Sequence, residues 1–179
     1  NRDLLIAQNN QLWRYRQEQK TWELWAETPA AKYNQEIIAL NAQTDPEMVW
    51  ISANLQLWQL KEQNLKVIWK SKTNIEQLLQ DHQNQIWMGT SKGLFQFNPE
   101  TNLVTSHLIS EDIQSLSLDQ DQNIWVGTKE QGIFYYNDQQ QWQNQSWTEG
   151  LPQDHVQSLI VSPENQVWLA LDRENVHWT

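Results

Sequence analysis

The stretch IWVGT at residues 124–128 decides the fold, because the chain repeats it. A near copy, IWMGT, occupies residues 86–90, and looser copies stand at 49–52 (VWIS) and 167–170 (VWLA). Their tryptophans recur every 37 to 43 residues, and a β-branched residue lies twelve positions before each tryptophan. A period near 40 residues is typical either of paired helices or of four-stranded β-propeller blades.

The hydrophobic runs inside each repeat favour strands. They are short, rich in Ile, Val, Trp, Phe and Thr, and bounded by Asn, Asp, Gly or Pro, which is the signature of β-strands. No stretch keeps the i, i+3, i+4, i+7 pattern of an amphipathic helix. We therefore predict an all-β fold, a β-propeller built of four-stranded antiparallel blades with strands a to d in chain order.

The repeat register sets the expected blade boundaries. It predicts three complete blades between two partial ones, about four and a half in all, at residues 1–27, 36–71, 74–109, 112–148 and 155–179. The sequence starts in strand b without an initiator Met, and residues 176–179 align with strand c. We expect a trimmed segment of a larger, seven-bladed ring. The last strand of each blade, strand d, is predicted at residues 21–26, 65–70, 103–109 and 141–148.

Side chains of the repeated strand alternate between two faces. Trp87 and Gly89 share one face, and Ile86, Met88 and Thr90 share the other, as expected for a blade packed between two neighbours. The small residue after the tryptophan would admit a bulky side chain from the next blade. The predicted structural anchors are Trp50, Trp87, Gly89, Thr90, Trp125, Gly127, Thr128 and Trp168, with the four tryptophans in the core. Strand d is expected to leave its tryptophans partly exposed, at Trp25, Trp69 and Trp147.

The a–b turns are predicted at residues 81–84, 119–122 and 162–165. Asp or Ser at the start of such a turn can bind the backbone two residues on. Asn at its end tolerates a positive φ, whereas Gln122 does not suit one. The Asp-to-Trp spacing is similar to the Asp-box turn of sialidases, which is a structural turn. Asp119 and Asp121 are therefore interpreted as structural rather than catalytic.

Composition excludes several functions. A net charge of −10 and a pI near 4.7 exclude nucleic-acid binding, because a protein that binds nucleic acid needs a stripe of basic residues on its surface. Cysteine is absent, and no apolar run is long enough for a membrane span. The four histidines, His82, His107, His155 and His177, lack metal-ligand spacing. Glu111 and Asp112 form a carboxylate pair in sequence alone. We expect no metal, no cofactor and no catalytic residue in this segment.

The search for a binding surface moves to the loops. In a propeller the d–a and b–c loops gather at one face around the central channel, and long loops on a rigid scaffold often carry recognition. The longest are residues 28–35 and 148–155. The candidate ligand-binding residues are Tyr33, Lys92, Asp112, Lys129, Glu130, Asp154, His155 and Arg173. For each of them, a solvated loop without a ligand stays an open alternative.

A family resemblance rests on two stretches. Residues 147–159, WTEGLPQDHVQSL, resemble the d–a connection of the two-component regulator propeller repeat, and residues 113–136 are similar to its strands a to c. The resemblance implies a sensor region of a bacterial hybrid histidine kinase or related regulator. Such regions lie on the periplasmic or extracellular side of the inner membrane, ahead of a β-sandwich, a membrane helix and a kinase or cyclase output domain. The chain departs from the family where the turn glycine is replaced, at Asn84, Gln122 and Asn165.

These observations lead to a functional expectation. The chain is expected to be a non-catalytic sensor module that binds a small molecule or glycan, such as an oligosaccharide, and the sugar preference is implied by the resemblance alone. Membrane association is expected through absent parts of the protein, with a homodimer as a possible full-length state. Two alternatives stay open, a protein-interaction scaffold and the propeller part of a polysaccharide-acting enzyme, because a fold does not select a function.

Overall fold

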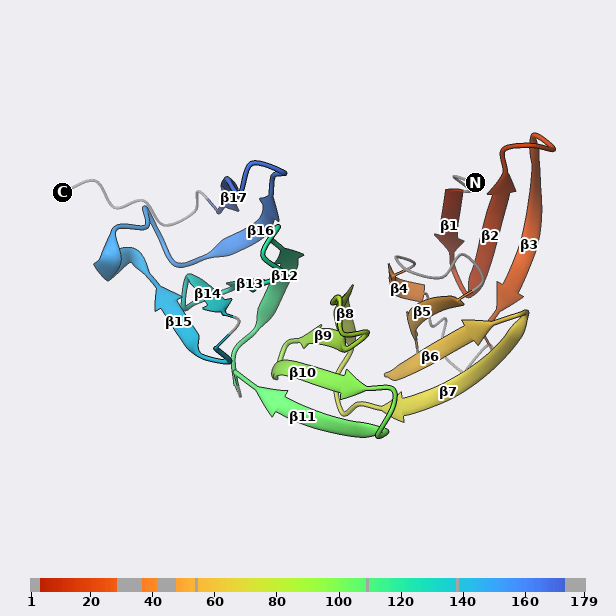
Figure 1. Ribbon diagram of the computed structural model, residues 1–179, viewed down its shortest axis with the longest axis horizontal. Coiled ribbons are helices and arrows are strands. Elements are labelled where there is room, and N and C mark those ends of the chain that lie inside the picture. The colour runs from red at the N-terminus through yellow and green to blue at the C-terminus, as the bar shows by residue number, and fades with distance from the viewer. Residues whose placement is uncertain are drawn as a thin grey trace. The chain divides into compact units, whose positions relative to one another are not determined.

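The computed structural model describes residues 4–28, 37–41, 48–53, 55–108, 110–137 and 139–172. These residues form strands β1 to β17 and one short 3-10 helix, η1 (Trp147–Glu149). The chain divides into two compact units, Asn1–Leu78 and Leu79–Thr179. The predicted all-β architecture of antiparallel sheets is confirmed (Figure 1).

The first unit holds a three-stranded and a four-stranded sheet. In both, each strand pairs antiparallel with the next along the chain, in the orders β1-β2-β3 and β4-β5-β6-β7. The strands are β1 (Leu4–Gln8), β2 (Gln11–Arg16), β3 (Thr21–Glu27), β4 (Ile37–Asn41), β5 (Met48–Ala53), β6 (Gln56–Lys61) and β7 (Asn64–Lys70).

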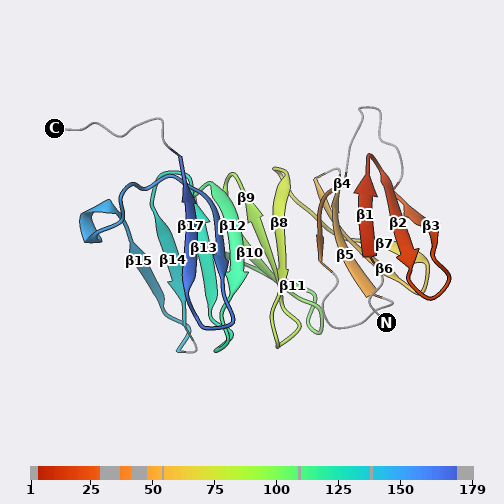
Figure 2. The same ribbon diagram turned by 90° about the horizontal axis from the view of Figure 1, so that it is seen from above.

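The second unit begins within β8 and continues the same pattern. Its sheets have the orders β8-β9-β10-β11, β12-β13-β14-β15 and β16-β17, and Figure 2 shows β12, β13, β14 and β15 one after another. The strands are β8 (Ile75–Gln80), β9 (Ile86–Thr90), β10 (Gly93–Asn98), β11 (Leu103–His107), β12 (Ile113–Leu118), β13 (Ile124–Thr128), β14 (Ile133–Tyr136), β15 (Trp142–Gln145), β16 (Val156–Val161) and β17 (Val167–Leu171). The strand c predicted at residues 176–179 lies outside the described residues.

Two details of the predicted register are wrong. Strand d at 141–148 is too long, because β15 ends at Gln145 and the chain turns into η1. The Ser146 carbonyl accepts the Glu149 N–H at 3.0 Å, and the Glu149 carboxylate accepts the Ser146 N–H at 2.8 Å. In the first four-stranded sheet, Ile37 takes the place that Ile113 has later, opposite the third residue after the tryptophan. Ile38, which the spacing selected, is 42% exposed.

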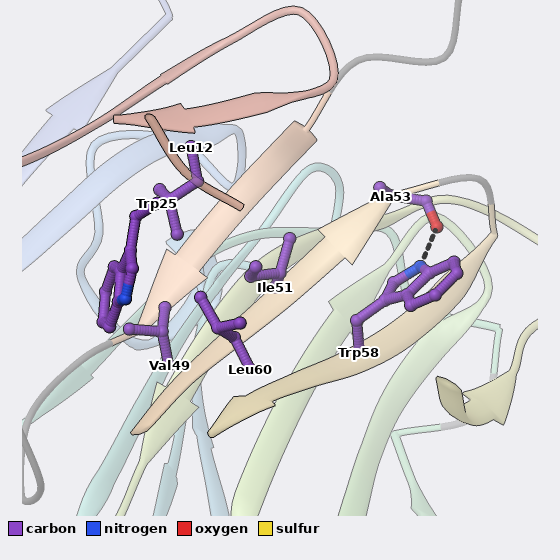
Figure 3. Packing of buried hydrophobic residues seen from close by; sticks show 7 residues of the cluster. All are labelled: Leu12, Trp25, Val49, Ile51, Ala53, Trp58 and Leu60. Atoms are coloured by element: carbon purple, nitrogen blue, oxygen red, sulfur yellow. Dashed lines mark hydrogen bonds between the residues drawn. The ribbon is translucent and has the colours of Figure 1, made fainter. Parts of the chain in front are cut away.

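The core of the first unit lies between its two sheets (Figure 3). Leu12 and Trp25 from the first sheet pack with Val49, Ile51 and Leu60 of the second, together with Ala53 and Trp58. Trp25 was expected to be partly exposed, and this is wrong: it is 7% exposed and faces the second sheet. The Arg14 guanidinium lies 4.7 Å from the centre of its ring, a cation–π contact. Trp69 is half-buried, as predicted.

The tryptophan of the motif is held by the preceding turn. In the β8–β9 turn the Asp81 carboxylate accepts the Trp87 indole N–H at 2.8 Å and the backbone N–H groups of Gln83 and Gln85 at 2.9 Å. The β12–β13 turn repeats this arrangement, with Asp119 accepting the Trp125 indole N–H at 3.0 Å. Such charge-assisted bonds fix both turn and ring. The structural interpretation of Asp119 is confirmed.

The glycine of the motif makes room for the next sheet. A Cβ added at Gly127 would lie 2.7 Å from Val156 and 3.1 Å from Leu159, both on β16 of the following sheet, and 2.6 Å from the Ser115 hydroxyl. The predicted close approach is confirmed. In the first unit Ser52 occupies the equivalent position, and its hydroxyl donates to the Ile75 carbonyl at 2.7 Å. A polar side chain is tolerated there because it finds a partner.

The threonine of the motif closes the b–c turn. The Thr90 hydroxyl donates to the Gly93 carbonyl at 2.9 Å and accepts the Lys92 N–H at 3.1 Å. The Thr128 hydroxyl does the same with Gly132 and Gln131, at 2.8 and 3.0 Å. Both threonines are fully buried, so the hydroxyl satisfies backbone groups that water cannot reach.

Trp168 does not belong to the core, and this prediction is wrong. Its side chain is 62% exposed, whereas Trp50 and Trp87 are 1% exposed and Trp125 is half-buried. Trp87 packs with Ile113, Ile124 and Val126 of the following sheet. Among the residues that the structure describes, no further sheet follows β17 to cover Trp168 in this way.

The a–b turns end at a residue with positive φ, as the sequence suggested for Asn84 and Asn165. Gln122 also adopts this conformation, with φ at 66°, although its side chain is less suited to it than Asn or Gly. As for membranes, the described part of the chain contains no helix with the length and apolar character of a bilayer span.

Candidate functional site

The predicted ligand-binding residues of the second unit lie where d–a loops meet b–c turns. We call this end of the sheets the loop rim: residues 91–92, 108, 110–112, 129–132, 146–155 and 172. Backbone hydrogen bonds connect these segments in pairs. In each pair a d–a loop is joined to a b–c turn or, for the last pair, to Asp172 after β17. The four hydrogen bonds are Ser110 N to Lys92 O at 3.4 Å, Lys129 N to Asp112 O at 3.0 Å, Gly132 N to Asp154 O at 3.0 Å, and Asp172 N to His155 O at 3.3 Å.

The centre of the loop rim carries carboxylates. Asp112 accepts the Gln114 side-chain amide at 2.9 Å, and Lys129 and Glu130 are exposed beside it. Burial, and then the negative charge of Glu130, raise the pKa of Glu111. Glu111 and Glu130 are therefore close enough to repel each other. Such a pair favours a ligand that supplies hydrogen-bond donors or positive charge.

The last part of the loop rim is ordered by its own turn. The Ser146 carbonyl accepts the Leu151 N–H at 3.1 Å, and Leu151 packs next to Gly132. This positions Asp154 and His155 beside the end of β17. There the His155 imidazole lies 3.5 Å from the Asp172 carboxylate, with both side chains about one-third exposed.

The structure thus brings some predicted residues together and not others. Asp112 meets Lys129, and His155 meets Asp172, while Lys92 contacts the rim through its backbone. Tyr33 and Arg173 lie outside the described residues. Glu111 was recognised only as a sequence neighbour of Asp112, and its coupling to Glu130 was missed. The repeat register predicts Asp172 in a b–c loop, because it stands four residues after Trp168 as Lys129 does after Trp125, but its contact with His155 was not predicted.

The rim has no geometry for a metal centre. No group of three or more His, Asp or Glu side chains converges in a metal-binding arrangement within the described ranges. What the rim offers is a set of oxygen acceptors with two nearby ammonium groups, on backbone that is fixed in place. That combination suits the recognition of hydroxyl-rich or charged ligands.

Residues 107–130 match the family described as two component regulator propeller. The matched segment runs from the end of β11 through the 108–112 loop to Glu130, so it includes both segments at the centre of the loop rim. No curated protein matches the chain in sequence.

Solved structures match over nearly the whole chain. One is the extracellular domain of a one component system from B. thetaiotaomicron, with a TM-score of 0.73 and 21% identity over 94% of this chain and 25% of that chain. A second is described as the extracellular domain of a hybrid two component system from the same organism, with a TM-score of 0.72, 21% identity, and coverage of 93% and 24%. The chain spans about a quarter of their length.

A third similar structure is virginiamycin B lyase from Staphylococcus aureus. Its TM-score is 0.72 at 11% identity, over 93% of this chain and 59% of that chain. At such identities the likeness concerns the fold alone, and the fold is shared by proteins with unrelated activities. The chain is thus a partial β-propeller whose residues 107–130 match the two component regulator propeller family.

Proposed function

We propose that the chain is a non-catalytic, ligand-sensing propeller module of a bacterial signalling protein, facing the periplasm or the cell exterior. The observation that carries this proposal is the family match at residues 107–130, because it covers the loops that form the centre of the loop rim. The likeness to extracellular domains of one component and hybrid two component systems supports the same reading.

The proposed ligand is an oligosaccharide bound at the loop rim. Its support is chemical: Glu111, Asp112 and Glu130 present carboxylate oxygens, which accept hydrogen bonds from sugar hydroxyls. Lys129 adds donors for ring or hydroxyl oxygens. Because a backbone hydrogen bond from Lys129 to Asp112 holds the two segments together, little conformational entropy is lost when a ligand binds.

A thermal-shift screen of the chain against neutral and acidic oligosaccharides tests the proposal. A ligand that binds the folded state raises the midpoint of unfolding in a concentration-dependent way. In the double variant K129Q/E130Q the affinity should fall about tenfold, the effect of losing about 1.4 kcal/mol of charge-assisted contacts. E100Q is the matched control, since Glu100 is exposed in the β10–β11 turn at the other end of its sheet.

Two results would count against the proposal. If no oligosaccharide raises the unfolding midpoint, the sugar assignment fails. If one does, but K129Q/E130Q and E100Q bind it as tightly as the parent chain, then the binding site lies away from the loop rim.

A further inference from the structure

A pocket lies at the opposite end of the second unit's sheets from the loop rim. Its volume is about 270 Å³, and it is formed by the β8–β9, β12–β13 and β14–β15 turns together with strand residues Gln96 and Tyr136. We call it the turn pocket. It lies between the sheets β8–β11 and β12–β15, and no candidate residue from the loop rim lines it.

The aromatic part of the turn pocket is rigid. Trp87 is fixed by Asp81, as described above, and its ring centre lies 5.6 Å from that of Tyr136 in an edge-on arrangement. Tyr136 also contacts Trp142, with ring centres 4.6 Å apart, and His107 at 5.7 Å. Burial raises the pKa of Tyr136, so its hydroxyl stays protonated and can both donate and accept a hydrogen bond.

The polar part of the turn pocket consists mainly of neutral amides. Gln83, Gln122 and Gln140 line it, and within the described ranges no hydrogen bond is seen to their side-chain amides. The bond that the Gln85 side chain donates to Gln83 goes to the backbone carbonyl of Gln83. Asn137 accepts the Gln141 N–H at 2.9 Å with its side-chain oxygen, which leaves its NH₂ group for the pocket. The Gln96 oxygen is engaged by His107 at 3.3 Å. Each amide offers donors and an acceptor side by side.

The charges of the turn pocket select against anions. Two aspartates, Asp81 and Asp121, line it, and no lysine or arginine is among its described lining residues. The one described lining side chain that can carry positive charge is the His82 imidazole. A phosphate, sulfate or carboxylate group would therefore meet two aspartates and no lysine or arginine, although such groups are bound in proteins chiefly by cations and backbone N–H groups. A neutral ligand with many hydroxyl groups fits the alternating donors and acceptors.

We propose that the turn pocket binds a single neutral sugar ring through the amides of Gln122, Asn137 and Gln140 and the hydroxyl of Tyr136. The volume is at the lower limit of small-molecule pockets, about 300–1,000 Å³, and therefore suits one ring rather than a chain. The site is separate from the loop rim, so this inference does not depend on the proposed function.

Nuclear magnetic resonance of the ¹⁵N-labelled chain tests it with glucose, galactose, mannose and xylose as probes. The indole N–H of Trp87 reports on the pocket, because Trp87 lines it. The indole N–H of Trp58, which donates to the Ala53 carbonyl at 3.2 Å in the first unit, is the internal reference. We expect at least one sugar to shift the Trp87 signal in a saturable way and to leave the Trp58 signal unchanged.

Variants then locate the site. Q122G removes a lining amide at a position with φ of 66°, and N102G is its matched control, with φ of 57° in the β10–β11 turn away from the pocket. Q122G and Y136F should each weaken sugar binding about fivefold, the loss of one neutral hydrogen bond. N102G should bind as the parent chain does.

Four results would overturn the inference. Three of them are no saturable Trp87 shift with any of the four sugars, equal binding by Q122G and N102G, and tighter binding of glucose 6-phosphate than of glucose. Loss of oligosaccharide binding in K129Q/E130Q with retention of the Trp87 shift would show that the two sites are independent. The opposite pattern, in which K129Q/E130Q abolishes the Trp87 shift, would place the sugar at the loop rim and contradict the turn pocket.

Discussion

Trp87 and Trp168 occupy the same position of the repeat within the second unit, yet one is 1% exposed and the other 62%. Trp87 has an aspartate in the preceding turn and a following sheet packed over it. Trp168 has Ser162 in place of the aspartate and Ala170 in place of the glycine. Trp50 is likewise 1% exposed, although Thr44 and Ser52 stand in place of the aspartate and the glycine. These two motif residues alone therefore do not decide whether the tryptophan is buried.

The largest expected effect separates the two tryptophans directly. W87A should lower the free energy of unfolding by about 3–5 kcal/mol, because it removes a buried ring and leaves a cavity. W168A should change it by about 0.5 kcal/mol or less, as exposed sites usually do. Urea unfolding followed by circular dichroism measures both. Equal losses in the two variants would mean that Trp168 is covered in solution.

The second-largest contrast is expected between the β8–β9 turn and the β16–β17 turn. D81A should lower the free energy of unfolding by about 2–3 kcal/mol, because the buried Trp87 indole N–H and two backbone N–H groups lose a charged acceptor. S162A should cost about 0.5–1 kcal/mol, because the Ser162 hydroxyl accepts only backbone N–H groups, from Glu164 and Gln166. The same urea unfolding measurement compares the two variants. If D81A lowers the free energy of unfolding no more than S162A does, the Asp81 carboxylate does not stabilise the turn and the Trp87 ring as described.

The small residues should show a further contrast. G127A should cost about 1–2 kcal/mol, since the added methyl group overlaps Val156 and Ser115 unless the following sheet moves. The equivalent residue of β17, Ala170, is exposed, and A170V should lie within about 0.5 kcal/mol of the parent chain. A neutral G127A would show that the seam between these sheets is looser than the contacts indicate.

The smallest expected effect is a pH dependence of the free energy of unfolding that arises at His107, next to Trp87. Burial lowers the pKa of His107 from its ordinary value, and its Nδ1 accepts the Trp142 indole N–H at 3.4 Å. The folded state therefore prefers neutral His107. The resulting stability is complete above about pH 6.5, the unfolded value, and is lost as the pH falls through the lower folded value.

The control for this prediction is H107Q, which cannot titrate. As the pH falls below about 6.5, the parent chain should lose stability more steeply than H107Q does. The Trp87 indole signal should shift over the same range in the parent chain, since the His107 and Trp87 rings lie 5.1 Å apart. Identical pH slopes in the two proteins would rule out His107 as the source.

Sequence periodicity was sufficient to predict the antiparallel sheets and the close approach at Gly127. The Asp–Trp bond and the threonine bonds of the b–c turn recur in the same register, but they were not predicted from it. Trp25 and Trp168 could not be assigned in this way, because their burial depends on a neighbouring sheet. The turn pocket was missed for a similar reason: its lining residues Gln96, Tyr136 and Gln140 stand on different strands or turns, and their positions are not part of the motif.

The loop rim is held by main-chain atoms, and this has an evolutionary consequence. The bond from Lys129 N to Asp112 O and that from Asp172 N to His155 O use no side-chain atom, so substitutions at these four positions leave the attachment intact. Selection can therefore alter which molecules such a surface recognises without destabilising the fold. Related proteins are expected to diverge fastest at these positions, while the Asp, Trp, Gly and Thr of the repeat change slowly.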